Sequence, residues 1–135
     1  MDYQLHGFII GREIHFDIFN QRLYRLPSRH ADQSIVFVTI GLNKTMLALF
    51  LYLMRNARQR PVSKDELIRH VWEENNLSCS SQRLWQVLNN LRKKLELLGL
   101  PGDFVTYVKG EGYRIADEQI RPVYTKENAV ANIDE

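Results

Sequence analysis

One stretch of helical periodicity, over residues 81–98, constrains the fold of this chain more than any other feature. At 100° per residue, one face of such a helix is entirely apolar and consists of Leu84, Val87, Leu88, Leu91, Leu95 and Leu98. Gly99 supplies a C-cap and Pro101 prevents continuation. The pattern predicts a helix of about five turns whose leucine stripe faces a core.

The opposite face of this helix has an unusual composition. It carries four amides and one cation, which are Gln82, Gln86, Asn89, Asn90 and Lys93. Arg83 and Trp85 lie on either side of this face. A solvated helix usually mixes acidic and basic residues, and asparagine is a poor helix former. Asparagine and glutamine can bond adenine in the major groove, and lysine can reach guanine or phosphate. The face indicates either base readout or a plain polar surface.

Strands are expected before the helices, at residues 8–10, 14–18, 22–26 and 34–40. Apolar and polar residues alternate from Glu13 to Ile18, and Asn20-Gln21 offers a turn. The β-branched and aromatic run 34–40 predicts a well-buried strand, and a polar loop is expected over 27–33. Together these segments predict an antiparallel sheet of three or four strands.

Two further helices are expected between the sheet and the long helix. Asn43 is a suitable N-cap for a core helix that contains the apolar run 46–54. Ser63 and Glu66 match a capping box, in which each side chain bonds the other residue's backbone amide. The apolar face of this second helix consists of Leu67, Ile68, Val71 and Trp72.

A polar loop over 73–79 leads to the long helix, and a hairpin is expected after it. Strands at 104–108 and 112–115 flank the glycine-rich turn Lys109–Gly112. Residues 117–135 show no periodicity and are expected to be a polar acidic tail or linker.

Length and charge indicate one basic domain, expected over residues 1–116. The chain has 135 residues and a net charge of +2. Residues 1–116 hold 16 Lys and Arg against 11 Asp and Glu, a net of +5, whereas residues 117–135 hold 2 against 5, a net of −3. The basic part indicates an anionic partner. The single cysteine, Cys79, excludes an internal disulfide, and no signal peptide or membrane span is expected.

Patterns for catalysis and for metal binding are not found in the sequence. The four histidines have no metal-ligand spacing to one another or to Cys79, and no glycine-rich phosphate loop follows a strand. A thiol–base pair of Cys79 and His70 lacks an oxyanion motif. We therefore expect a protein that is not an enzyme and that has no cofactor, metal site or small-molecule substrate.

Three motifs resemble the OmpR/PhoB-type winged helix-turn-helix family. Val62–Trp72 resembles its second helix, Leu91–Leu95 (LRKKL) the end of its recognition helix, and Val108–Arg114 (VKGEGYR) its wing. The resemblance covers about residues 7–116, and the opening strands are most similar to those of ToxR/CadC-like one-component regulators. It implies an α+β fold: a winged helix-turn-helix with an N-terminal antiparallel β-sheet, three helices and a C-terminal β-hairpin wing.

The resemblance implies a sequence-specific DNA-binding domain of a bacterial transcriptional regulator. Helix 81–98 would enter the major groove of double-stranded promoter DNA, and the wing at 104–115 would contact the adjacent backbone or minor groove. Asn90 and Gln86 are the expected base readers, and Arg92 has either a phosphate-binding or a structural role. Trp85 is expected to pack against the second helix or the loop after it; the alternative is contact with a sugar or a thymine methyl. The expected DNA-binding residues are Gln82, Arg83, Gln86, Asn89, Asn90, Arg92, Lys93, Lys109 and Arg114.

Further partners follow from the size of the module and from the resemblance. A single module binds DNA weakly, so a homodimer or tandem binding to repeated half-sites is expected. The resemblance also implies a contact between loop 73–79 and RNA polymerase, and a cytoplasmic location, either free or as the cytoplasmic part of an inner-membrane-tethered regulator. The competing interpretation is a winged-helix protein-interaction module with little DNA affinity, favoured by the modest charge, the acidic tail and Glu111 at the wing tip.

Overall fold

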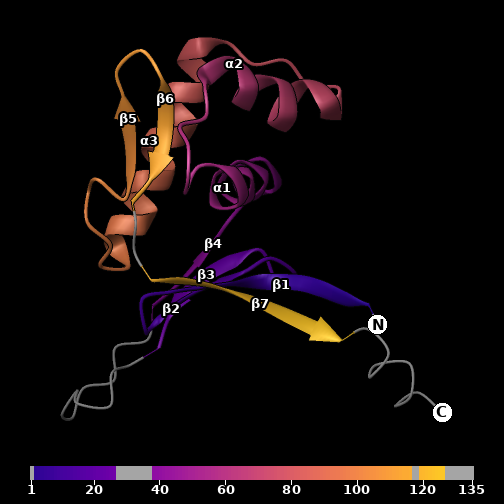
Figure 1. Cartoon of the computed structure of the whole chain (residues 1–135), viewed down its shortest axis with the longest axis vertical. Helices are drawn as coiled ribbons and strands as arrows, with labels where there is room; N and C mark the ends of the chain where they lie inside the picture. The colour runs from indigo at the N-terminus through magenta and orange to yellow at the C-terminus, as the bar shows by residue number, and fades with distance from the viewer. Residues whose placement is uncertain (1, 27–37, 117–118, 127–135) are drawn as a thin grey trace. The chain divides into compact units, whose positions relative to one another are not determined.

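The structure, a computed structural model, describes residues 2–26, 38–116 and 119–126 (Figure 1). The chain divides into two compact units. The sheet unit comprises Met1–Gly41 and Glu118–Glu135, and the helical unit comprises Leu42–Asp117. Both ends of the chain therefore belong to the sheet unit.

The sheet unit contains one antiparallel sheet of five strands in the order β4-β3-β2-β1-β7. The hairpin predicted around Asn20-Gln21 is confirmed, because Asp17 accepts hydrogen bonds from the backbone and side-chain amides of Asn20 at 3.2 and 2.8 Å. Alternation along the strands places five side chains on a buried face: Phe8, Ile10, Ile14, Phe16 and Leu23. The strands are β1 (Tyr3–Ile10), β2 (Ile14–Asp17), β3 (Arg22–Arg25), β4 (Val38–Gly41) and β7 (Ile120–Lys126).

The expected burial of the fourth strand is wrong for the residues that the structure describes. Val38 and Ile40 are half-buried and Thr39 is exposed. The reason is topological, because β4 is an outer strand of the sheet. The remainder of the expected strand, residues 34–37, and the expected loop 27–33 lie outside the described residues.

The expectation of a tail or linker over 117–135 is wrong for Ile120–Lys126. These residues form β7, which pairs with β1 from Tyr3 opposite Lys126 to Ile10 opposite Ile120, with a shift of register between Leu5 and Gly7. Figure 1 shows β7 in yellow beside β1 in indigo. The strand is an outer one and contains Pro122, which such positions tolerate because one edge makes no ladder hydrogen bonds. Pairing with β7 also extends β1 well beyond the short strand expected at 8–10.

Three helical segments and a hairpin form the helical unit. Helix α1 (Lys44–Asn56) is capped by Asn43, whose side chain accepts the Met46 amide at 2.8 Å as predicted. Helix α2 (Lys64–Leu67) continues as a π-helical turn (Ile68–Trp72). Helix α3 (Ser81–Leu97) begins after the N-cap Ser80. The predicted leucine stripe of α3 is confirmed, since all six of its members are buried.

Two local expectations around α2 need correction. Residues expected to begin the loop, Glu73–Asn75, form a 3₁₀ turn that ends at Asn76 in the left-handed region with φ of 61°. The Ser63 hydroxyl accepts the Glu66 amide at 3.1 Å, as a capping box requires. The Glu66 carboxylate, however, is turned towards Tyr52 and Arg60 instead of back towards the cap.

The C-terminal hairpin of the helical unit consists of β5 (Val105–Val108) and β6 (Gly112–Ile115). It is fixed to the turn between α1 and α2, because Val62 and Tyr113 exchange two backbone hydrogen bonds of 2.8 Å. Gly112 makes this close approach feasible, since a Cβ there would lie 2.2 Å from the Val62 carbonyl oxygen. Across the described ranges, no helix is long and apolar enough to cross a membrane.

Candidate nucleic-acid interface

The amide face of α3 makes no polar contact with the described residues. Gln82, Gln86, Asn90 and Lys93 are exposed and Asn89 is half-buried. None of these five side chains has a hydrogen bond or ion pair with any residue in the described part of the chain. The Ser80 hydroxyl caps the helix by accepting a hydrogen bond of 3.0 Å from the backbone amide of Arg83. The guanidinium of Arg83 takes no part in this cap and is exposed. The face is therefore a row of open hydrogen-bond donors and acceptors on one rigid element.

Arg92 stands apart from this row. Its side chain is half-buried, and its Nε donates a hydrogen bond of 2.9 Å to the carbonyl oxygen of Val105. This bond joins α3 to β5. Burial raises the pKa of the Tyr113 phenol, and the positive charge of the Arg92 guanidinium acts in the opposite direction. Of the two roles considered for Arg92, the structural one would need a contact of this kind.

Two large aromatic side chains are exposed in the same unit. Trp85 is 56% exposed, so packing against α2 does not bury it. Tyr107 on β5 is 55% exposed and meets Tyr113 edge-to-face, with ring centroids 5.0 Å apart. Sequence reasoning missed Tyr107, because in a strand pattern its ring is an ordinary apolar member of the hairpin.

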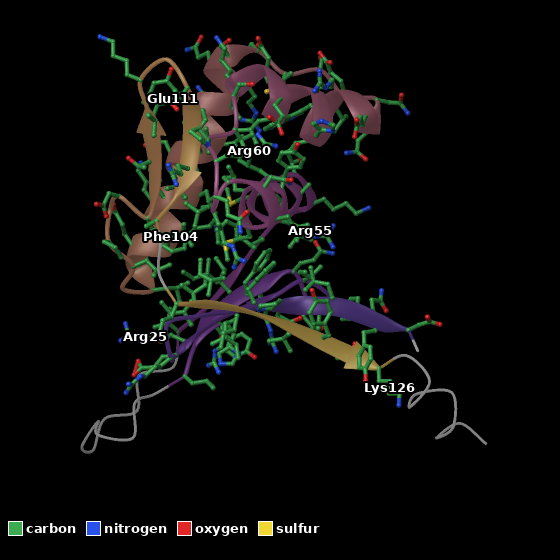
Figure 2. All side chains as sticks on the ribbon, viewed as in Figure 1. Arg25, Arg55, Arg60, Phe104, Glu111 and Lys126 are labelled. Atoms are coloured by element: carbon green, nitrogen blue, oxygen red, sulfur yellow. The ribbon has the colours of Figure 1, made fainter. Side chains whose placement is uncertain are left out.

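The wing tip places opposite charges close together. Gly110 has φ of 80° and Gly112 has φ of 133°, which is the backbone freedom that the predicted turn needs. Lys109 and Glu111 are both exposed (Glu111 is labelled in Figure 2), and neither forms an ion pair with another described residue. The tip itself therefore carries no net charge, and its one cation is Lys109.

Arg114 does not belong to the tip. It lies between Tyr113 and Ile115, whose amides donate to Val62 at 2.8 Å and to Ala57 at 2.9 Å. Exposed Arg114 is consequently next to the turn that joins α1 to α2. The structure thus separates the predicted set into a row on α3, Lys109 at the tip, Arg92 between α3 and β5, and Arg114 beside this turn.

A polar cluster behind α2 holds the helix-turn-helix in place. Glu66 accepts two hydrogen bonds from the Arg60 guanidinium, at 3.0 and 2.7 Å, and one from the Tyr52 hydroxyl at 2.5 Å. His70 stacks on Tyr52 with centroids 5.1 Å apart and lies 2.9 Å from the Glu74 carboxylate. The hydrogen bonds from Arg60, followed by that from Tyr52, lower the pKa of Glu66 to about 2 although burial opposes them.

No group of three or more His, Cys, Asp or Glu side chains among the described residues is arranged to hold a metal ion. Burial raises the pKa of the Cys79 thiol, with Arg83 acting in the opposite sense. Cys79 donates to the Ser80 carbonyl at 3.2 Å. His70 stacks on Tyr52 and lies against Glu74, and no hydrogen bond joins it to Cys79 among the described residues.

Comparison with known proteins agrees with this arrangement. The family model described as "Transcriptional regulatory protein, C terminal" matches residues 38–115. The DNA-binding domain of Escherichia coli CadC superposes with a TM-score of 0.64 at 18% identity, over 92% of this chain and 100% of that one. The DNA-binding domain of the response regulator AdeR, crystallised in complex with an intercistronic region, superposes with a TM-score of 0.57 at 21% identity, over 77% and 94% of the two chains. No curated protein matches in sequence. The expected α+β winged helix-turn-helix fold is confirmed.

Proposed function

The chain belongs to the family of C-terminal domains of transcriptional regulatory proteins, the OmpR/PhoB-type DNA-binding domains, and from this premise we propose that it recognises specific sequences in double-stranded promoter DNA. Family and fold are those of DNA-binding transcription regulators and not those of enzymes. The observation that carries the proposal is the unpartnered amide face of α3. We take the DNA-binding domain to be residues 1–116 together with β7, which completes the sheet.

In the proposed complex, α3 lies in the major groove and the hairpin contacts the adjacent backbone or minor groove. Asn90 and Gln86 each offer a donor and an acceptor to an adenine edge. Arg83 and Lys93 contact guanine or phosphate, and Gln82 and Asn89 extend the row. Lys109 contacts the DNA from the wing, and Arg114 contacts a phosphate beside it. Arg92 acts by holding β5 against α3, since its Nε is committed to Val105.

Base readout is tested by comparing specificity with affinity. Asn90→Ala and Gln86→Ala should each relax base preference at one position of the operator, at a cost of about 1–3 kcal/mol for a missing bidentate pair. Lys109→Ala should instead weaken binding to all duplexes and reduce the salt dependence by about one phosphate contact. Selection from a randomised duplex library measures the preference, and Gln4→Ala, an exposed amide of the sheet unit, is the control.

A library selection that returns no preferred sequence for the wild type would contradict the proposal. The competing interpretation, a protein-interaction module, is favoured by Glu111, which cancels the charge of Lys109 at the wing tip. Under that interpretation Asn90→Ala and Gln86→Ala would leave DNA retention unchanged. Retention of duplex DNA by the wild type at low salt, together with weaker retention by Lys109→Ala, would exclude it.

Assembly and polymerase contact extend the proposal. A homodimer or tandem binding to repeated half-sites would supply the affinity that one module lacks. A chain that binds promoters would lie in the cytoplasm, either free or as the cytoplasmic part of an inner-membrane-tethered regulator. For the proposed contact of residues 73–79 with RNA polymerase, Glu73 is the better probe, because Glu74 is engaged by His70. Glu73→Ala should reduce transcription of a target promoter while DNA binding is unchanged; unchanged transcription would remove this contact from the proposal.

A further inference from the structure

A cavity of about 470 Å³ lies at the C-terminal end of α1, apart from the amide face of α3. Three guanidinium groups and two amides line it, and no carboxylate does. Figure 2 shows Arg55 beside α1 and Arg60 between α1 and α2. The lining side chains are Arg55, Asn56, Arg58, Gln59 and Arg60. Every one of them carries N–H donors, so the cavity is built to face acceptor oxygens.

The charges at this cavity are only partly compensated. Arg60 donates two hydrogen bonds to Glu66, which neutralises one guanidinium. The side chains of Arg55 and Arg58 have no hydrogen bond or ion pair with any residue described by the structure. The carbonyl end of α1 contributes a partial charge of only about −0.5. A net positive potential therefore remains at the cavity.

Backbone hydrogen bonds fix the cavity beside the wing. Ala57 accepts the Ile115 amide at 2.9 Å, and Val62 exchanges two bonds of 2.8 Å with Tyr113. The intervening turn, which carries Arg58 and Arg60, is thereby held along β6, next to exposed Arg114. Cationic side chains thus run from β6 to the end of α1 without using any residue of α3.

We propose that the cavity at the end of α1 binds a phosphate group. Guanidinium groups bind phosphate through paired N–H donors, and Arg55 and Arg58 are the two that have no partner of their own. The phosphate can come from the DNA backbone next to the wing, which would lengthen the DNA contact beyond α3, or from a free phosphate compound. Asn56 is held in place for this role, because its amide donates to the Tyr52 carbonyl at 2.9 Å.

The DNA source is tested with the double variant Arg55→Gln/Arg58→Gln. Because neither side chain has a partner among the described residues, the variant should unfold at the same urea concentration as the wild type. Lys44→Gln is the matched control, since it removes one exposed charge from the opposite end of the same helix. With DNA as the source, the double variant binds specific and scrambled duplexes more weakly by the same factor. The slope of log affinity against log salt then falls by about one for each phosphate that the variant no longer binds.

The free source is tested without DNA. Inorganic phosphate and ATP are titrated into the full chain, and the backbone amide resonances of residues 55–60 are followed by NMR. Saturable shifts in the wild type that are absent in the double variant identify a free phosphate compound as the ligand. The proposal is overturned if two results are found together. The first is that the double variant loses no more DNA affinity for each charge removed than Lys44→Gln does, and the second is that no saturable shift occurs in the wild type. Base preference is measured separately, with the Asn90 and Gln86 variants. The proposal of base readout and the proposal of a phosphate site can therefore fail independently.

Discussion

At the residue scale, Glu66 joins three segments of the helical unit, two through its carboxylate and one through its backbone amide. It reaches α1 through Tyr52, the turn after α1 through Arg60, and the start of α2 through its own amide, which Ser63 caps. The sequence predicted the cap but assigned the carboxylate to a local bond. The carboxylate instead ties the start of α2 to α1 and to the turn between them, and these bonds fix the direction in which α2 runs towards α3.

This carboxylate should make stability depend on acid. The pKa of Glu66 is lowered from 4.5 to about 2 in the folded protein, so its contribution is complete above the pKa of the unfolded chain and is lost as the pH falls from about 4.5 towards 2. Glu66→Gln should cost about 1–2 kcal/mol at pH 7 and much less at pH 2.5. Urea unfolding at both pH values measures the difference.

Glu96→Gln is the control for this measurement, because Glu96 is exposed and has no ion pair with a described residue. It should change the free energy of unfolding by no more than about 0.5 kcal/mol at either pH. A Glu66→Gln variant that is equally destabilised at pH 7 and pH 2.5 would show that the charge of this carboxylate contributes nothing.

At the scale of elements, the sequence predicted those helices and strands whose signals lie within one short segment. Helix α3 was placed correctly because its leucine stripe and the glycine and proline after it lie within one continuous stretch. Strand β7 was missed because its seven residues show neither alternation nor a turn signal. Its partner, β1, lies more than a hundred residues away in the sequence. The half-buried state of β4 was missed for the same reason, since it depends on strand order.

The hairpin offers a matched pair of glycines for a test at this scale. Gly112→Ala should cost about 3 kcal/mol or more, because the new Cβ would collide with the Val62 carbonyl and φ of 133° is strained for alanine. Gly110→Ala has only the strain of φ 80° and open space around it, so it should cost about 1 kcal/mol. Urea unfolding gives both values. Equal losses would mean that the contact between β6 and the α1–α2 turn is dispensable.

At the scale of the whole molecule, residues from both chain ends complete one sheet. A chain that ends at Ala116 lacks β7 and leaves one edge of β1 without its hydrogen bonds. The amides of β1 should then exchange with solvent at least about tenfold faster than in the full chain. Hydrogen exchange followed by NMR measures this. A chain that ends at Lys126 keeps β7 and should retain the protection; equal exchange in both truncated chains would contradict the role given to β7.

The sequence reveals one part of the candidate site, and the contacts of the other part are visible only in the fold. The amide face of α3 was predictable, because one helix carries it and its spacing is local. The bond of Arg92 to Val105 spans thirteen residues, and the cavity at the end of α1 depends on backbone pairing between Val62 and Tyr113. Neither has a local signal, so the sequence placed Arg92 and Arg114 in the interface without revealing their neighbours.

The antiparallel pairing of β1 with β7 has a mechanical consequence. Tyr3 lies opposite Lys126, so the chain enters and leaves this pair of strands at the same end. A pulling force applied at Tyr3 and Lys126 would load the hydrogen bonds of the pair one after another, and not all at once in shear. The pair of strands should therefore separate at a lower force when pulled at Tyr3 and Lys126 than it would if it were loaded in shear.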